Sequence, residues 1–235
     1  MTTGPIGLVG SGEFTPATES IDLALLEGRP RKVVFLPTAA APEGSTTTKY
    51  WTQLGRNHYL RLGIDATPLP VLNRDDANRD DLAAELATAG LIYLSGGDPT
   101  YLATTLVGSR VGDAITETWH RGAAVAGCSA GALALMDLVP DIRTRGANPS
   151  AGLGLVHNLF VMPHFDQLET WSPGATQWAL DTLPPGPHLI GIEEDTGIVG
   201  GPTEWRVLGR QRAWLLRRDG GRAAFASGET LTLLD

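Results

Sequence analysis

The chain has 235 residues, 42% of them hydrophobic and 19% charged, which is enough to build one α/β domain over residues 1–235. A formal net charge of −8 argues against non-specific nucleic-acid binding, and no apolar run reaches the roughly 18 residues of a membrane span. The single cysteine excludes an intrachain disulfide, and the first residues lack the positive region of a signal peptide. We therefore expect a cytoplasmic protein whose partners are small molecules or peptides. A homodimer is compatible with these features.

Short apolar runs bounded by Gly, Pro or Asp alternate along the chain with longer segments of helical spacing. Strands are predicted at 6–9, 33–36, 91–94, 123–127, 159–162 and 189–192. Helices are predicted at 46–62, 79–89, 99–105, 112–121 and 174–182. This alternation predicts an α/β fold with a mostly parallel, doubly wound sheet and flanking helices.

The pattern changes from residue 197 onward. The apolar runs become short, separated by turns and in places alternating, at 197–201, 205–208, 213–216, 223–225 and 231–234. Asp219-Gly220-Gly221 has the composition of a hairpin turn. We predict an antiparallel C-terminal extension of the sheet.

The turn Gly127-Cys128-Ser129-Ala130-Gly131 follows a predicted strand and precedes a predicted helix. Gly-x-Ser-x-Gly in this context is the pattern of a nucleophile elbow, in which a sharp turn presents the serine hydroxyl above the sheet. The plainer alternative is a turn of small residues that lets strand and helix pack closely. Cys128 precedes the nucleophile position, where its side chain would point away, so we interpret it as a small buried hydrophobe.

His164 is the candidate general base, because it closes the apolar run 159–163, one strand after Ser129. The other histidines lack this position at the carboxyl end of a strand. His58 and His120 lie in predicted helices and are expected at the surface, and His157 and His188 precede strands at the opposite edge.

A histidine base needs a carboxylate that fixes its tautomer. Glu194 ends the next strand and is the first choice, while Glu193 and Asp195 should alternate away from it. Asp137 and Asp141, downstream of the nucleophile turn, are the reserve candidates. A solvated acidic turn is the plainer alternative for Glu193–Asp195.

Two backbone amides are candidates for the oxyanion hole. The amide of Ala130 lies at the start of a predicted helix, where an unsatisfied donor and the helix dipole favour negative charge. Gly97 follows a neighbouring strand in the Gly96-Gly97 pair, and a glycine lets the backbone approach a substrate closely. In isolation, that pair is equally compatible with a plain strand-to-helix turn.

Four motifs together resemble peptidase family S51, the family of dipeptidase E and cyanophycinase, over residues 6–201. They are Leu94–Asp98, Gly127–Ala132, Pro163–Phe165 and Gly191–Thr196. The resemblance implies the class I glutamine amidotransferase-like fold, Ser129 as nucleophile, His164 as base, and Gly97 and Ala130 as oxyanion donors. Cyanophycinase-like members have a glutamate in the segment similar to 191–196, which favours Glu194. Dipeptidase E-like members use an aspartate after the serine, where residues 143–148 of this chain have no carboxylate.

The segment after His164 departs from these relatives. In dipeptidase E and cyanophycinase, an arginine in this segment binds the aspartyl carboxylate of the substrate. Residues 146–205 of this chain contain no Lys or Arg, so such a contact would have to come from Arg143 or Arg145, on the other side of the pocket. We therefore expect substrates other than Asp-X. The side chains of Asp166, Glu169 and Trp171 suit a free amino terminus, a cation or an apolar group.

The predicted activity is hydrolysis of a small peptide or amide by a Ser-His-Glu triad through an acyl-enzyme. This chemistry requires no metal or organic cofactor, the histidines are not at ligand spacing, and Gly10–Thr15 lacks the third glycine of GxGxxG. Two alternatives stay open: a glutaminase-like amidohydrolase, and a non-catalytic small-molecule binding protein on the same fold.

Overall fold

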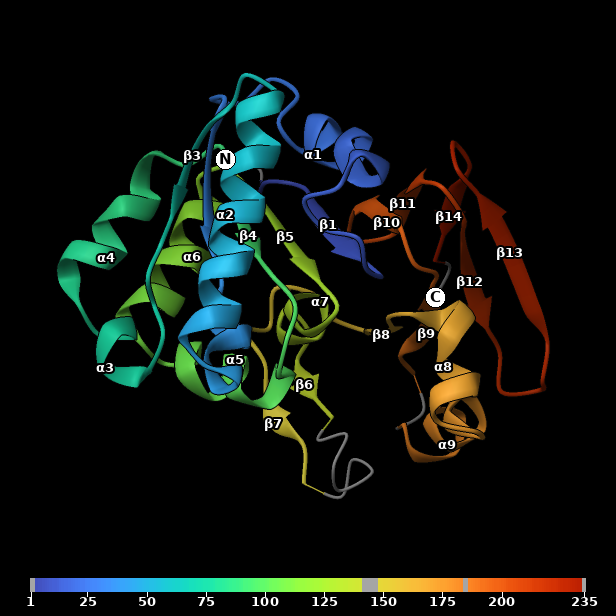
Figure 1. Cartoon of the computed structure of the whole chain (residues 1–235). Helices are drawn as coiled ribbons and strands as arrows, with labels where there is room; N and C mark the ends of the chain where they lie inside the picture. Colours follow the sequence, from blue (N-terminus) through green and yellow to red (C-terminus); the bar gives the residue numbers. More distant parts are fainter. Residues whose placement is uncertain (1–2, 141–147, 184–185, 234–235) are drawn as a thin grey trace.

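The computed structural model of the chain describes residues 3–140, 148–183 and 186–233. Within these residues the centre of the fold is an eight-stranded sheet beside a four-stranded one (Figure 1). In spatial order, the larger sheet consists of β14 (Thr230–Thr232), β11 (Glu204–Gly209), β10 (Thr196–Gly200), β1 (Ile6–Val9), β5 (Ala124–Cys128), β4 (Leu91–Leu94), β2 (Lys32–Leu36) and β3 (Asp65–Pro68). The five strands from β1 to β3 are parallel, and β10, β11 and β14 are antiparallel to their neighbours. The predicted α/β fold, with its mostly parallel sheet and antiparallel C-terminal strands, is confirmed.

The smaller sheet contains two strands that we expected in the larger one. It consists of β13 (Arg222–Ala226), β12 (Arg212–Leu216), β9 (His188–Ile192) and β8 (Leu159–Met162). The strands predicted at 159–162 and 189–192 therefore lie outside the sheet that carries Ser129. A buried apolar run indicates a strand but does not specify its partner, so the sequence pattern could not separate the two sheets.

Helices cover both faces of the larger sheet because its strands are buried on both sides. One face packs against α1 (Glu19–Leu25) and α2 (Ser45–Arg61). The opposite face packs against α4 (Asp80–Glu85), α5 (Pro99–Leu106), α6 (Arg110–His120) and α7 (Ala130–Ala134). Further short elements are the helix α3 (Arg74–Ala77), the strands β6 (Leu138–Val139) and β7 (Ser150–Ala151), and three 3-10 helices, η1 (Pro16–Thr18), η2 (Thr38–Glu43) and η3 (Leu86–Thr88).

Side chains of the smaller sheet join the core of the larger one. Leu159, Val161, Ile190 and Ile192 belong to the same buried cluster as Leu8 of β1. The other face of the smaller sheet packs against α8 (Phe165–Trp171) and α9 (Ala175–Thr182), which lie beside it in Figure 1. A shared apolar core therefore holds the two sheets together.

Two of the short connections that cross between the sheets lie side by side. Residues 193–195 join β9 to β10, and residues 210–211 join β11 to β12. The crossings are hydrogen-bonded to one another: the amide of Arg210 donates to the carbonyl of Asp195 (2.8 Å), and the amide of Glu193 donates to that of Arg212 (3.1 Å). The segment that contains Glu194 is thus part of the junction between the sheets.

Several elements were not predicted. Strand β3 has no fully buried residue, so it lacks the apolar run by which a buried strand is recognised. Helices α1 and α8 have only seven residues each, too few for a clear helical period.

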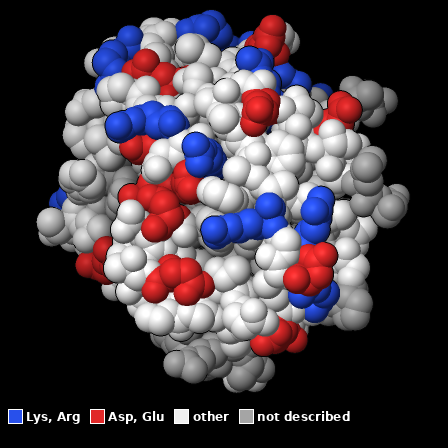
Figure 2. All heavy atoms as spheres, turned by 90° about the vertical axis from the view of Figure 1, so that its right-hand side faces the viewer, with Lys and Arg blue, Asp and Glu red and all other residues white. Residues whose placement is uncertain are grey.

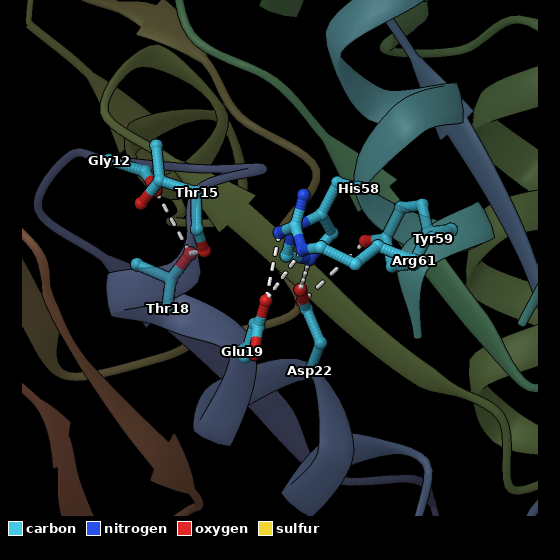
Figure 3. Close-up of polar contacts among 8 residues, drawn as sticks. All are labelled: Gly12, Thr15, Thr18, Glu19, Asp22, His58, Tyr59 and Arg61. Atoms are coloured by element: carbon cyan, nitrogen blue, oxygen red, sulfur yellow. Dashed lines mark hydrogen bonds and ion pairs between the residues drawn. The ribbon is translucent and has the colours of Figure 1, made fainter. Parts of the chain in front are cut away.

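The surface location expected for His58 is wrong. His58 is fully buried on α2, where its Nε2 lies 2.7 Å from Asp22 Oδ2 on α1 and its Nδ1 lies 3.0 Å from the Arg61 guanidinium (Figure 3). Burial raises the pKa of the Asp22 carboxyl, against the opposing hydrogen bond and charge of His58. Arg61 also binds Glu19 at the protein surface (2.8 Å). This network links α1 to α2.

Replacing Asp22 tests the network. We expect Asp22→Ala to lower the free energy of unfolding by about 3–5 kcal/mol, because it removes the carboxylate that contacts Nε2 of the buried His58. Glu19→Ala removes only a partly exposed ion pair and should cost about 1 kcal/mol or less. Urea titrations measure both values. Equal losses in the two variants would contradict this account.

Candidate active site

Ser129 lies at the sharp turn between β5 and α7. Its φ of 50° and ψ of −108° are in a region that non-glycine residues rarely adopt. A side chain on Gly127 would collide with the backbone of Gly131, and one on Gly131 would collide with the carbonyl of Leu94. The two glycines therefore permit the close packing that the turn requires, and the amide of Ser129 is held by the carbonyl of Val9 (2.9 Å).

His164 follows β8 in the smaller sheet and is the N-cap residue of α8, with a left-handed backbone conformation (φ 53°, ψ 36°). Its Nε2 lies 3.0 Å from Ser129 Oγ, and its Nδ1 lies 3.0 Å from Glu194 Oε1. The tautomer protonated at Nδ1 would donate to the carboxylate and accept the serine proton at Nε2. The structure thus brings together Ser129, His164 and Glu194, the three residues chosen from the sequence.

Glu194 is held in place by two side chains that the sequence analysis did not assign to this task. Its amide donates to Asp166 Oδ1 (2.8 Å), and its carbonyl accepts a hydrogen bond from Gln211 Nε2 (3.0 Å). Partial burial alone would raise the pKa of Asp166. The hydrogen bonds from Glu194, Gln167 and Gln211 outweigh that effect and leave this pKa below its ordinary value. Position alone, two residues after His164, was a weak signal for Asp166, and nothing in the sequence marked Gln211.

The neighbouring carboxylates point elsewhere. Glu193 accepts hydrogen bonds from the amide of Arg212 (2.9 Å) and from Trp214 Nε1 (2.8 Å), and Asp195 pairs with Arg210 (3.1 Å). Asp137, a reserve candidate, pairs with the exposed His157 (2.7 Å). The other reserve, Asp141, lies outside the described residues, as do Arg143 and Arg145.

The Gly96-Gly97 turn lies beside Ser129. A side chain on Gly96 would come within 3.6 Å of Ser129 Cβ, and one on Gly97, whose φ is 140°, would collide with the backbone of Ala39. The amide of Ala130 is at the first position of α7. Both predicted oxyanion donors are therefore on segments adjoining Ser129.

Side chains following His164 border the site in different ways. Glu169 accepts hydrogen bonds from the amides of Gly174 and Thr176 (2.8 Å each), and Asp166 is engaged with Glu194, so both carboxylates have internal partners. Trp171 is 60% exposed, with its ring centre 5.3 Å from that of His164. Trp171 therefore offers an accessible apolar surface next to the imidazole.

Cys128 is completely buried beneath the turn, on the sheet face covered by α1 and α2. Burial and the nearby carboxylate of Glu13, which accepts a hydrogen bond from Sγ (2.8 Å), raise the pKa of the Cys128 thiol well above its ordinary value. The thiol is thus protonated at neutral pH and shielded from solvent.

The described residues contain no group of three or more His, Cys, Asp or Glu side chains arranged to hold a metal ion. In the same residues, no helix has the length and apolarity required to cross a bilayer. Figure 2 shows basic and acidic side chains interspersed over one face of the molecule, so that face is not uniformly basic.

Comparisons with known proteins give consistent relationships. The model of peptidase family S51 matches residues 6–203. A crystal structure of a peptidase from an acI-B1 actinobacterium is 37% identical, with a TM-score of 0.90, covering 98% of this chain and 97% of that one. A putative peptidase E protein from Listeria monocytogenes EGD-e is 17% identical, with a TM-score of 0.61 and coverages of 96% and 99%, which shows likeness of fold. A search of curated proteins found no match.

The burial of Cys128 predicts that its thiol is inert in the folded protein. We expect no modification by a thiol-specific disulfide reagent at neutral pH, and one equivalent after denaturation, measured by absorbance and intact mass. Rapid stoichiometric labelling of the native protein would contradict the structure and would make Cys128 a competing nucleophile.

Proposed function

This chain belongs to peptidase family S51, a family of serine peptidases, and we propose that it hydrolyses a peptide or amide bond of a small peptide with a Ser129-His164-Glu194 triad. The observation that carries the proposal is the continuous path of two 3.0 Å contacts from Ser129 Oγ through the imidazole to Glu194. Such a path joins nucleophile, base and orienting carboxylate.

In the proposed acylation, Ser129 Oγ bonds to the substrate carbonyl carbon while its proton moves to His164 Nε2. The negative charge of Glu194 stabilises the imidazolium that forms. When the tetrahedral intermediate collapses, the carbon–nitrogen bond breaks and His164 returns the proton to the departing amine. An ester between Ser129 and the acyl group remains.

Water completes the proposed cycle. His164 takes a proton from the water as its oxygen bonds to the acyl carbon, and the carbon–oxygen bond to Ser129 then breaks, with Oγ regaining the proton. The amides of Gly97 and Ala130 are the proposed donors to the oxyanion in both halves of the reaction. Their positions beside Ser129 and at the start of α7 support this role.

The choice of Glu194 over Asp137 is supported by their partners. Glu194 contacts His164, whereas Asp137 contacts His157. The backbone of Glu194 is further fixed by the hydrogen bond that its amide donates to Asp166 and by the one that its carbonyl accepts from Gln211. A fixed carboxylate keeps the imidazole in one orientation.

The proposed substrate class is a small peptide whose acyl group is apolar rather than acidic. Residues 146–205 contain no Lys or Arg to bind a substrate carboxylate, and Asp166 and Glu169 already bind backbone amides. Trp171 offers an accessible side chain beside His164. Aromatic surface of this kind favours contact with apolar groups.

A serine-directed phosphonylating reagent tests the proposed triad. We expect a single adduct on the wild type, measured by intact mass, and none on Ser129→Ala. His164→Ala and Glu194→Gln should slow the reaction by about 10²–10⁴-fold, because the base is lost or misoriented. Asp137→Asn, the matched control, should react like the wild type. An adduct that survives in Ser129→Ala, or a loss in Asp137→Asn rather than Glu194→Gln, would contradict the assignment.

A dipeptide panel tests the proposed substrate class. We expect kcat/KM to be higher for peptides with Leu or Phe before the scissile bond than for Asp-X. Trp171→Ala should lower kcat/KM for the Leu and Phe substrates by about threefold to tenfold, the size of a lost aromatic contact. Tyr50→Ala, which removes an equally exposed aromatic on α2, is the control. Exclusive cleavage of Asp-X would overturn the proposal, and ammonia release from glutamine alone would favour a glutaminase.

A further inference from the structure

Glu13 is a buried acidic residue just after β1 to which the proposed mechanism gives no task. Its side chain lies at the carboxyl ends of three adjacent parallel strands, β1, β5 and β4, and the residue is only 5% exposed. One carboxylate oxygen accepts a hydrogen bond from the amide of Gly96 (2.8 Å), and the other accepts one from the Cys128 thiol (2.8 Å). One rigid group therefore contacts both segments that flank the substrate carbonyl in the proposed mechanism.

The segment that carries Glu13 is itself held firmly. The carbonyl of Gly12 accepts hydrogen bonds from the hydroxyls of Thr15 (2.7 Å) and Thr18 (2.9 Å), which close the loop before α1 (Figure 3). Phe14 has a positive φ of 63° and is buried, with its ring 5.1 Å from that of Tyr93. These contacts set the position from which the Glu13 side chain reaches the site.

One of the hydrogen bonds of Glu13 holds the backbone next to Gly97. Upstream, the amide of Gly96 is bound by Glu13, and downstream, the amide of Asp98 is bound by the carbonyl of Ala39 (2.8 Å). Gly97 lies between these two anchors with a φ of 140°, and because it has no Cβ its backbone can rotate when an anchor is lost. Because the carboxylate also binds Cys128, it ties this turn to the residue before Ser129.

Burying a carboxylate costs free energy, because the group loses its hydration. An apolar side chain of similar volume would avoid the desolvation of the charge, and the thiol is only a weak hydrogen-bond donor. The geometry has a specific benefit, since two oxygens of one planar group define the spacing between the Gly96-Gly97 turn and the nucleophile turn.

We propose that Glu13 is a positioning residue that aligns the Gly97 amide with Ser129 for binding of the oxyanion. The inference rests on the proposed function, because it assigns Glu13 a part in that reaction. Glu13 acts through Gly96 and Cys128 and does not touch the substrate. Gln retains an acceptor for the Gly96 amide at the same reach, whereas Asp keeps the charge but is one methylene too short to reach both partners.

The test measures phosphonylation rate as a function of pH for wild type, Glu13→Ala, Glu13→Asp and Glu13→Gln. We expect the maximal rate to fall at least tenfold in Glu13→Ala and Glu13→Asp, toward the roughly 10²-fold loss of one oxyanion donor, and to stay within threefold in Glu13→Gln. The pH of half-maximal rate should not change, because His164 and Glu194 are untouched. Asp22→Asn, which alters a buried carboxylate outside the site, should lower Tm without lowering the maximal rate.

Three results would overturn the inference: a wild-type rate in Glu13→Asp, equal losses in Glu13→Asp and Glu13→Gln, or a loss in Asp22→Asn as large as in Glu13→Asp. If Glu13→Ala does not fold, the comparison of Glu13→Asp with Glu13→Gln still decides.

Hydrogen exchange of the Gly96 amide is a readout independent of activity. We expect protection in wild type and Glu13→Gln, and faster exchange in Glu13→Asp. An unreactive wild type with this exchange pattern would overturn the proposed function while confirming the anchor, whereas unchanged exchange in Glu13→Asp would overturn the anchor itself.

Discussion

The junction between the two sheets is the constraint on which the arrangement of the site depends. Ser129 follows a strand of the eight-stranded sheet, whereas His164 follows a strand of the four-stranded sheet. Their 3.0 Å contact therefore requires that the sheets keep one relative position. The shared apolar core holds the two sheets against each other. The hydrogen bonds between the connections at 193–195 and 210–211 fix how the sheets are aligned at the point where Glu194 lies.

Strained backbone is concentrated at this same edge of the molecule. Four of the five non-glycine residues with positive φ in the described part of the chain lie here, namely Ser129, His164, Asp195 and Phe14, and Asn158 is the exception. Each such conformation costs of order 1–3 kcal/mol. Neighbouring hydrogen bonds hold these conformations: the amide of Ser129 binds Val9, and the carbonyl of Asp195 binds Arg210. Rigid surroundings of this kind pre-organise the side chains, so little reorganisation is needed when a substrate binds.

Two sets of buried polar groups lie on the α1 and α2 face of the larger sheet, and the one around Glu13 reaches the site. The Asp22–His58 contact joins the two helices, and Glu13 joins the loop before α1 to the turns at Gly96 and Cys128. The sequence contained a local signal for Glu13, since it follows a strand that ends at the predicted site. It contained none for His58, because a histidine among polar neighbours in a helix is as compatible with the surface as with a buried pair.

Local features could be predicted from the sequence alone: the alternating strands and helices, the small-residue turn around Ser129, and the positions of His164 and Glu194 at strand ends. These follow from hydrophobic periodicity and from the steric demands of a tight turn, both of which act between residues close in the chain. The tertiary structure was needed to show that His164 and Glu194 follow strands of a second sheet, that Asp166 and Gln211 hold Glu194, and that Glu13 bridges two turns. Those contacts join segments distant in sequence, and their partners are selected by packing of the whole core rather than by local pattern.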